Sequence, residues 1–417
     1  MSGLPELARR STNTPEAPLD STLLRQAICD SALRECTHAF RNQLSALIST
    51  GSLARDEASF LCKENSWTVC GDVEFMVVLE ENASLPAPAA LNGVRRRIEN
   101  DLLQRNIQCI IDLSAVHPGY FQRLPAHIFT YELKHCGQLV AGDERILRSI
   151  PDYLAENLSL EDAWRLLCNR LVEMLECAAE LSGGNKLPSA TLRYKILKLY
   201  LDMTTSFLVF VQAYVPTYRG RRDVLLRLSR ERPTGAYPFE LGSFANLVAD
   251  CTAQKLVPGA TNDLSIDLNW QAAIQAARAL WRWELARLVG AKTELTDFEL
   301  FNKWISLQPF TKRVRGWFYI LRASGWKRSY LILLRWLTLR KASPRHWTYL
   351  VASTLLFQAT AEVDSSQTHA QRVNCALLSS YLPVRRMTAK NHPSPSWEDL
   401  AHDVIWNYQQ FLMRTRA

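Results

Sequence analysis

The spacing of hydrophobic residues changes several times within the first 120 positions of the chain. Between residues 21 and 45 apolar side chains recur at every fourth position, which predicts a helix: Leu24, Ile28, Ala32, Cys36, Phe40 and Leu44. Short β-rich runs follow at 46–50, 73–79 and 107–113 and predict strands. A helical spacing returns at 91–106. The order helix, strand, helix, strand, helix, strand predicts a small α/β or α+β unit.

Beyond this unit the pattern becomes almost entirely helical. The segment 124–151 is mixed, with Gly137 and Gly142 as breakers, and 180–190 and 230–243 read as loops. Helices are predicted at 159–182, 189–215, 268–289, 296–307, 328–341, 346–362, 370–381 and 396–415. The predicted fold class is α+β, a small mixed sheet followed by a large all-helical domain. We assign 1–20 to a flexible tail, 21–150 to the mixed domain and 151–417 to the helical domain, which can divide near 230–265.

Composition adds few constraints. The chain has 417 residues, 47% of them hydrophobic, enough for two or three domains with a sizeable core. Its ten cysteines lack the short paired spacings of zinc sites, so we expect reduced thiols. The N-terminus lacks the apolar stretch of a secretory signal, and no apolar run approaches the roughly 18 residues of a spanning helix. We therefore expect a cytoplasmic protein with no transmembrane segment.

Charge is distributed unevenly. The net charge is 49 minus 41, or +8. The segment 300–361 contains no Asp or Glu, and it holds eleven Lys and Arg residues and five of the twelve tryptophans. The rest of the chain is therefore about −3. Two interpretations stay open: a helical core with tryptophans inside and solvated cations, or a surface that contacts a polyanion such as RNA.

Two predicted strands carry acidic residues. Side chains alternate between the faces of a strand, so Asp72 and Glu74 share one face. On the third predicted strand Asp112 shares a face with Ile110. If these strands are neighbours in one sheet, three carboxylates converge. The alternative is a solvated sheet face or an edge protected against aggregation.

A glycine and a serine, Gly51 and Ser52, end the first predicted strand where a helix begins. Such a turn exposes backbone N–H groups and a hydroxyl to an anion, and glycine permits the close approach that a phosphate needs. The Gly-Ser pair is common in turns, and it gains meaning here only together with the acidic strands.

These features together resemble the nucleotidyltransferase superfamily related to DNA polymerase β. The matching motifs are STGS at 49–52, DVEF at 72–75 and IIDLS at 110–114, in the family's order. GSLARDEAS is similar to the corresponding turn of bacterial adenylyltransferase-type members, and IFTYELKHCGQLVAGDERIL to the segment after their third acid. The resemblance covers residues 25–150, the catalytic domain of the family. Two departures are a long gap between Ser52 and Asp72 and a Glu at the second acidic position.

The resemblance implies transfer of a nucleoside monophosphate, with ATP as the favoured donor, to an acceptor hydroxyl with release of pyrophosphate. Two Mg²⁺ ions, or Mn²⁺, would be held by Asp72, Glu74 and Asp112, with Asp112 beside the acceptor. Gly51 and Ser52 would cradle the β- and γ-phosphates. The acceptor can be a small molecule, an RNA or a protein.

The resemblance also offers weaker phosphate-binding candidates. Arg55 lies one turn after Gly-Ser, although an exposed arginine is the simpler expectation. Lys195 and Lys198 share a helix face where polymerase-β relatives place triphosphate-binding cations, and a solvated amphipathic face is the alternative. The whole chain has a second interpretation as a catalytically silent relative that binds a polyanion.

Overall fold

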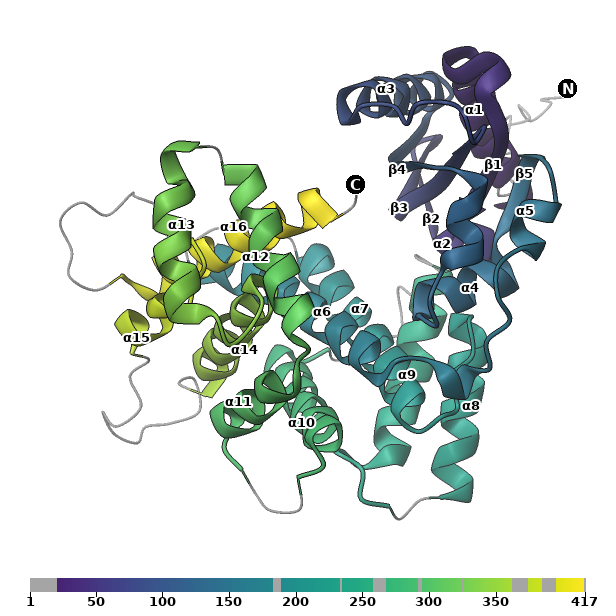
Figure 1. Ribbon diagram of the computed structural model, residues 1–417. Helices are drawn as coiled ribbons and strands as arrows, with labels where there is room; N and C mark the ends of the chain where they lie inside the picture. The colour runs from purple at the N-terminus through teal and green to yellow at the C-terminus, as the bar shows by residue number, and fades with distance from the viewer. Residues whose placement is uncertain are drawn as a thin grey trace, which may run out of the picture.

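Figure 1 shows a computed structural model that describes residues 21–182, 189–232, 235–257, 268–291, 295–324, 326–361, 374–384 and 395–415. The fold class is α+β, as the sequence predicted: a small mixed sheet lies in the N-terminal region, and helices make up the rest. The predicted N-terminal tail, 1–20, lies outside the described residues. The division into domains at residue 150 stays a prediction.

Five strands form one sheet around a long central strand. They are β1 (Leu44–Thr50), β2 (Phe60–Lys63), β3 (Ser66–Leu79), β4 (Ile107–Val116) and β5 (Gln138–Gly142). β3 pairs antiparallel with β2 along its first residues and with β1 along its second half. β4 pairs parallel to β3, and β5 pairs antiparallel to β1. The parallel pair requires a crossover, which α3 (Pro88–Gln104) supplies.

The alternation along the strands gives the sheet two different faces. Val73, Phe75 and Val77 of β3 belong to a core shared with α1 (Ser21–Phe40) and α3. Met76 and Val78 point the other way, into a second core with η2 (Pro118–Arg123), α4 (Ile128–Cys136) and α5 (Arg145–Arg148). We call this second side of the sheet the polar face, because the carboxylates of β3 and β4 lie on it.

The long gap before Asp72 is occupied by a β-hairpin. β2 and the start of β3 are joined by Glu64 and Asn65, both with positive φ, the conformation of a tight two-residue hairpin turn. The ladder between β3 and β4 then shifts between Thr68 and Asp72, and Gly71 has φ +130°. The hairpin extends β3 without moving the acidic residues off the sheet.

The helical region packs around one continuous core. Its helices are α6 (Leu160–Ser182), α7 (Ser189–Phe210), α8 (Tyr218–Glu231), α9 (Leu241–Leu256), α10 (Trp270–Val289), α11 (Asp297–Leu307), α12 (Phe310–Ser324), α13 (Trp326–Leu339), α14 (Pro344–Ala361), α15 (Cys375–Ser380) and α16 (Trp397–Thr415). Trp164 lies fully buried in this core, with its ring 4.5 Å from that of Trp304 and 6.2 Å from that of Trp281. None of the helices in the described ranges has the length and apolar character needed to cross a membrane.

Three helices of the helical region were absent from the sequence prediction. α8 is rich in arginine and buries only Arg221 and Leu225, so its apolar period is weak. α9 begins inside a predicted loop because the side chain of Glu240 caps it, accepting from the N–H groups of Gly242 and Ser243. α12 contains Gly316 and scattered cations. The helix predicted at 370–381 is described only as α15, since 370–373 lie outside the described residues.

All ten cysteines are free thiols, in agreement with the expectation of reduced cysteines. Four of them are buried: Cys36, Cys168, Cys177 and Cys251. Burial raises the pKa of the Cys36 thiol to about 12, which keeps it protonated and unreactive at neutral pH.

Candidate active site

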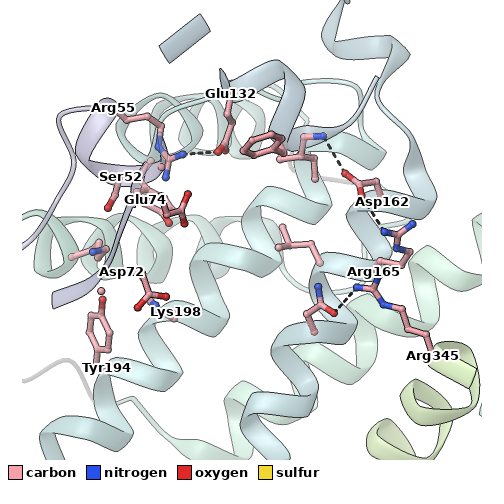
Figure 2. A pocket seen from close by; sticks show the side chains of 18 residues that line it. Ser52, Arg55, Asp72, Glu74, Glu132, Asp162, Arg165, Tyr194, Lys198 and Arg345 are labelled. Atoms are coloured by element: carbon pink, nitrogen blue, oxygen red, sulfur yellow. Dashed lines mark hydrogen bonds and ion pairs between the residues drawn. The ribbon is translucent and has the colours of Figure 1, made fainter. Parts of the chain in front are cut away.

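A cavity of about 370 Å³ lies between the polar face of the sheet and the helical region (Figure 2). One wall comes from α2 (Gly51–Ala54), β3 and α4, and the other from α6, α7, α8, α9 and α14. Its volume falls in the range of small-molecule sites. The lining residues are Gly51, Ser52, Arg55, Gly71, Asp72, Glu74, Ile128, Phe129, Glu132, Asp162, Arg165, Leu166, Asn169, Tyr194, Lys198, Tyr218, Lys255 and Arg345.

The three predicted carboxylates share the polar face of the sheet. Asp72 and Glu74 line the cavity. Asp112 pairs with Glu74 across the parallel ladder, while its neighbour Ile111 belongs to the core on the other side. Asp112 is not among the lining side chains. The sheet therefore brings the three acids to one face and presents two of them to the cavity.

The Gly-Ser turn is built around Glu74. The hydroxyl of Thr50 donates a hydrogen bond to Oε2 of Glu74 at 3.1 Å. Gly51 has φ +65°, and a Cβ at this position would come within 2.8 Å of the same oxygen. Glycine is therefore favoured both by the backbone conformation and by the approach of the carboxylate. Ser52 follows at the cavity wall.

The Glu74 carboxyl carries a charge that its surroundings compensate poorly. Burial raises its pKa, and the nearby charge of Asp112 raises it further. The Thr50 hydrogen bond and the Arg55 guanidinium act in the opposite direction, but the net shift is upward. A cation placed beside Glu74 would offset this cost.

We predict that Glu74→Gln stabilises the protein when no divalent ion is present. A carboxyl whose pKa is raised on folding contributes stability at low pH that is lost as the pH rises through its folded pKa. The variant should be more stable than the wild type at pH 7 by about 0.5–2 kcal/mol, the usual gain from a single stabilising substitution. The difference should shrink towards pH 4. Urea unfolding with chelator, across this pH range, measures it.

The control for this prediction is Glu64→Gln, in the exposed turn of the β2–β3 hairpin. It should leave the stability unchanged within about 0.5 kcal/mol at each pH. A Glu74→Gln variant that is less stable than the wild type at pH 7 contradicts the electrostatic account.

The donor set fits a divalent cation by chemical type. Carboxylate oxygens are the ligands that Mg²⁺ prefers, and Glu74 needs positive compensation. As the side chains stand, Glu74 is hydrogen bonded to Thr50. Within the described residues no cluster of three or more His, Cys, Asp or Glu has the arrangement to hold a metal ion. The metal site thus stays a prediction.

Two lysines line the cavity, and the sequence suggested only one of them, Lys198. Lys198 does so from α7, whereas Lys195 lies outside the lining set and pairs with Glu173 at 3.7 Å. The second lysine is Lys255 of α9, which donates to the hydroxyl of Ser59 at 2.6 Å. Burial and the charge of Lys198 lower the pKa of Lys255 to about 8. The two ammonium groups repel each other, and an anion between them would relieve this.

Arg55 is buried rather than exposed. Its guanidinium donates to Glu132 at 2.5 Å and lies 3.5 Å from Glu57. Glu132 also accepts hydrogen bonds from Arg221 and from the hydroxyl of Tyr214. Arg55 lines the cavity, but its charge is shared with carboxylates of the protein, and its role in phosphate binding stays a prediction.

Hydrogen bonds join the two regions around the cavity. Glu57, after α2, accepts from the backbone N–H groups of Tyr218 and Arg219 at 2.8 and 2.9 Å, at the start of α8. The hydroxyl of Tyr194 donates to the carbonyl of Cys70 at 2.6 Å, directly before Gly71 and Asp72. The relative position of the acidic strand and the helical wall is therefore fixed by several contacts.

The end of the cavity away from the acidic strand is cationic (Figure 2). Asp162, Arg165 and Asn169 lie at positions i, i+3 and i+7 of α6, on one helix face. Arg345 reaches the same place from the first turn of α14 and donates to Oδ1 of Asn169 at 3.1 Å. Leu166 and Phe129 lie on the lining as well. The cavity thus has one end where carboxylates and cations are mixed, and a cationic end where two arginines lie near one carboxylate, Asp162.

Sequence reasoning missed most of the helical wall. Lys255 carried a signal, since a lysine stands among the apolar positions of a helix, and so did the spacing of Asp162, Arg165 and Asn169. The pair of Glu132 and Arg221 carried none, because its members are 89 residues apart.

The acid-free segment 300–361 divides between core and surface. Trp304, Trp317 and Trp347 are buried, in agreement with the core interpretation of these tryptophans. The side chain of Trp326 lies outside the described residues. Arg345 lines the cavity. Exposed cations and exposed apolar side chains share the surface of α12 and α13: Lys312, Arg315, Phe318, Arg322, Tyr330, Leu333, Leu334 and Leu337. The polyanion contact through 300–361 stays a prediction.

No protein-family model matches the chain, and neither a curated protein nor a solved structure is significantly similar to it. Its function must therefore be argued from its own residues.

Proposed function

We propose that the protein is a metal-dependent nucleotidyltransferase that transfers a nucleoside monophosphate from a nucleoside triphosphate, with ATP favoured, to an acceptor hydroxyl. One observation carries the proposal. Asp72 and Glu74 line a cavity together with Gly51 and Ser52, and Asp112 pairs with Glu74 on the same face of the sheet. A simple solvated sheet face would not be expected to share a cavity with Lys198 and Lys255 of the helical wall.

The triphosphate would bind between the Gly-Ser turn and the two cavity lysines. The turn offers backbone N–H groups and the Ser52 hydroxyl, while Lys198 and Lys255 offer positive charge from the opposite wall. The repulsion that lowers the pKa of Lys255 would be offset by the phosphates. Lys255 therefore takes the place that the sequence gave to Lys195.

Asp72, Glu74 and Asp112 would hold Mg²⁺ or Mn²⁺, which when bound neutralises phosphate charge and lowers the pKa of the attacking hydroxyl. The acceptor oxygen forms a bond to the α-phosphorus, and the bond from that phosphorus to the oxygen bridging to the β-phosphorus breaks. Pyrophosphate leaves with the electron pair. The hydroxyl proton passes to the carboxylate of Asp112. Free thiols at all ten cysteines suit a reducing compartment such as the cytoplasm, where ATP and Mg²⁺ are abundant.

The test is incubation of the protein with each of the four α-labelled triphosphates, Mg²⁺ and cell extract, followed by separation of small molecules, RNA and protein. We expect label from one triphosphate, ATP first, in one fraction only, and none when chelator replaces Mg²⁺. Absence of transfer from all four, together with salt-sensitive RNA binding that Arg313→Glu/Arg315→Glu weakens, would instead favour the silent polyanion-binding interpretation.

A further inference from the structure

We propose that the acceptor is a small molecule with an oxyanion group, phosphate or carboxylate, and that Arg165 and Arg345 bind this group at the cationic end of the cavity. The inference rests on the proposed function, and it names the class of the second substrate. Its basis is the separation of charge within one cavity: the acidic strand and the lysines at one end, and the two arginines at the other (Figure 2).

Arg165 is held loosely by the protein itself. Its nearest carboxylate, Asp162, lies 3.9 Å away and already accepts from the backbone N–H of Ile128 at 3.1 Å. The Nε of Arg165 is buried and has no hydrogen-bond partner within the described part of the chain. A guanidinium with an unsatisfied donor at a cavity wall is costly unless a ligand accepts from it.

Arg345 is oriented by neutral side chains. It donates to Oδ1 of Asn169 at 3.1 Å and to the hydroxyl of Tyr349 at 2.5 Å. Tyr349 in turn donates to Asn169, so the three side chains fix one another. These contacts pre-organise the guanidinium at the cavity wall, and pre-organisation lowers the entropic cost of binding an anion there.

The buried side chain of His346 lies in a positive electrostatic environment created in part by the two arginines. Burial lowers the pKa of His346 well below its usual value, and the charges of Arg165, Arg345 and Lys312 lower it further. Arg55, which lines the other end of the cavity, provides the contrast: it approaches the carboxylate of Glu132 at 2.5 Å. Within the described residues Arg165, whose carboxylate contact is 3.9 Å, is thus less neutralised than Arg55.

The size and position of this end favour a small acceptor over a macromolecule. The cavity of about 370 Å³ must also admit the reacting part of the triphosphate. Arg345 is half-buried, and its guanidinium is hydrogen bonded to Asn169 of α6. An anion on a compact acceptor would bind here while the acceptor hydroxyl points towards the acidic strands. Leu166 and Phe129 would contact the apolar part of the acceptor.

Inorganic phosphate is the probe for the oxyanion site, with binding followed as thermal stabilisation of the full chain at constant ionic strength. Phosphate should stabilise the wild type, and it should still do so when Mg²⁺ and a non-hydrolysable ATP analogue fill the donor end. Arg165→Gln/Arg345→Gln should weaken phosphate binding about 10- to 100-fold. Arg315→Gln/Arg322→Gln, two exposed arginines outside the cavity, should leave it unchanged.

Arg165→Gln alone serves as a second variant, because Arg165 is partly exposed and its loss should spare the fold even if the double variant unfolds. Equal phosphate binding in the wild type and in Arg165→Gln overturns the proposal. Loss of phosphate binding when the ATP analogue is added also overturns it, because the arginines would then bind the nucleoside triphosphate instead of the acceptor. Label in the RNA or protein fraction also overturns it. Failure of the analogue to bind counts against the proposed nucleotidyltransferase function, whereas the phosphate comparison without analogue still tests the arginines.

Discussion

Replacing Asp72 with asparagine should lower nucleotidyl transfer by about 10³-fold or more, because the variant loses a carboxylate that would hold the metal ions against the α-phosphate. The amide keeps the shape of the side chain but not its charge. Asp72 is exposed on the strand, so its replacement should leave the unfolding free energy unchanged within about 0.5 kcal/mol. The initial rate of label transfer, with urea unfolding alongside, measures both expectations.

The matched control is Asp152→Asn, which removes an exposed carboxylate that pairs with Lys134 outside the cavity. It should retain the wild-type rate. If Asp72→Asn transferred label as fast as the Asp152→Asn control, Asp72 would have no catalytic role. The proposed enzyme mechanism would then lack its central residue. A loss of rate accompanied by unfolding is separated from a catalytic loss by the stability measurement.

The acidic half of the cavity was accessible from the sequence because its signals are local. Strand alternation placed Asp72 and Glu74 on one face from their spacing alone. The expectation that β3 and β4 are neighbours then gave Asp112 its position, and the parallel register pairs it with Glu74. The backbone at the Gly51-Ser52 turn has a positive φ close to the carboxylate of Glu74. This conformation favours glycine, and the glycine is visible in the sequence.

The helical half was not accessible, because its residues meet only through tertiary packing. Lys255 reaches the hydroxyl of Ser59 across 196 residues of sequence, and Arg345 reaches Asn169 across 176. No period within one helix encodes such a meeting. Arg55 illustrates the same limit: its position after Gly-Ser was readable, but its burial depends on Glu132. α9 was missed for a different reason, since a glutamate side chain provides its N-cap.

The largest loss of stability is expected from Glu132→Ala. The Glu132 carboxylate receives Arg55, Arg221 and the hydroxyl of Tyr214, so it connects α2, α4 and α8 behind the cavity. Its removal leaves two enclosed guanidiniums without their shared partner. Breaking a buried ion pair from one side costs about 3–5 kcal/mol. Urea unfolding at pH 7 should show a loss of this size.

Two further measurements separate this account from simple loss of packing. Burial opposes ionisation of Glu132, but Arg55 and Arg221 outweigh it and lower the pKa of the carboxyl. A lowered folded pKa contributes stability that is present above the unfolded pKa, about 4.3, and is lost as the pH falls through the folded value. Glu132→Gln, which keeps the volume, should therefore be less stable than the wild type at pH 7 and lose less stability on acidification.

Glu144→Ala provides the contrast, because it breaks an equally short ion pair, 2.6 Å to Arg148, that is 70% exposed at the glutamate. Exposed pairs contribute about 0–1 kcal/mol, since water solvates both ions when the pair is broken. Glu132→Ala should thus cost several times more than Glu144→Ala. Equal losses of unfolding free energy in the two variants would mean that water solvates the Glu132 ion pairs as it does the exposed pair. Packing alone, without these ion pairs, would then hold the cavity wall around Arg55 in place.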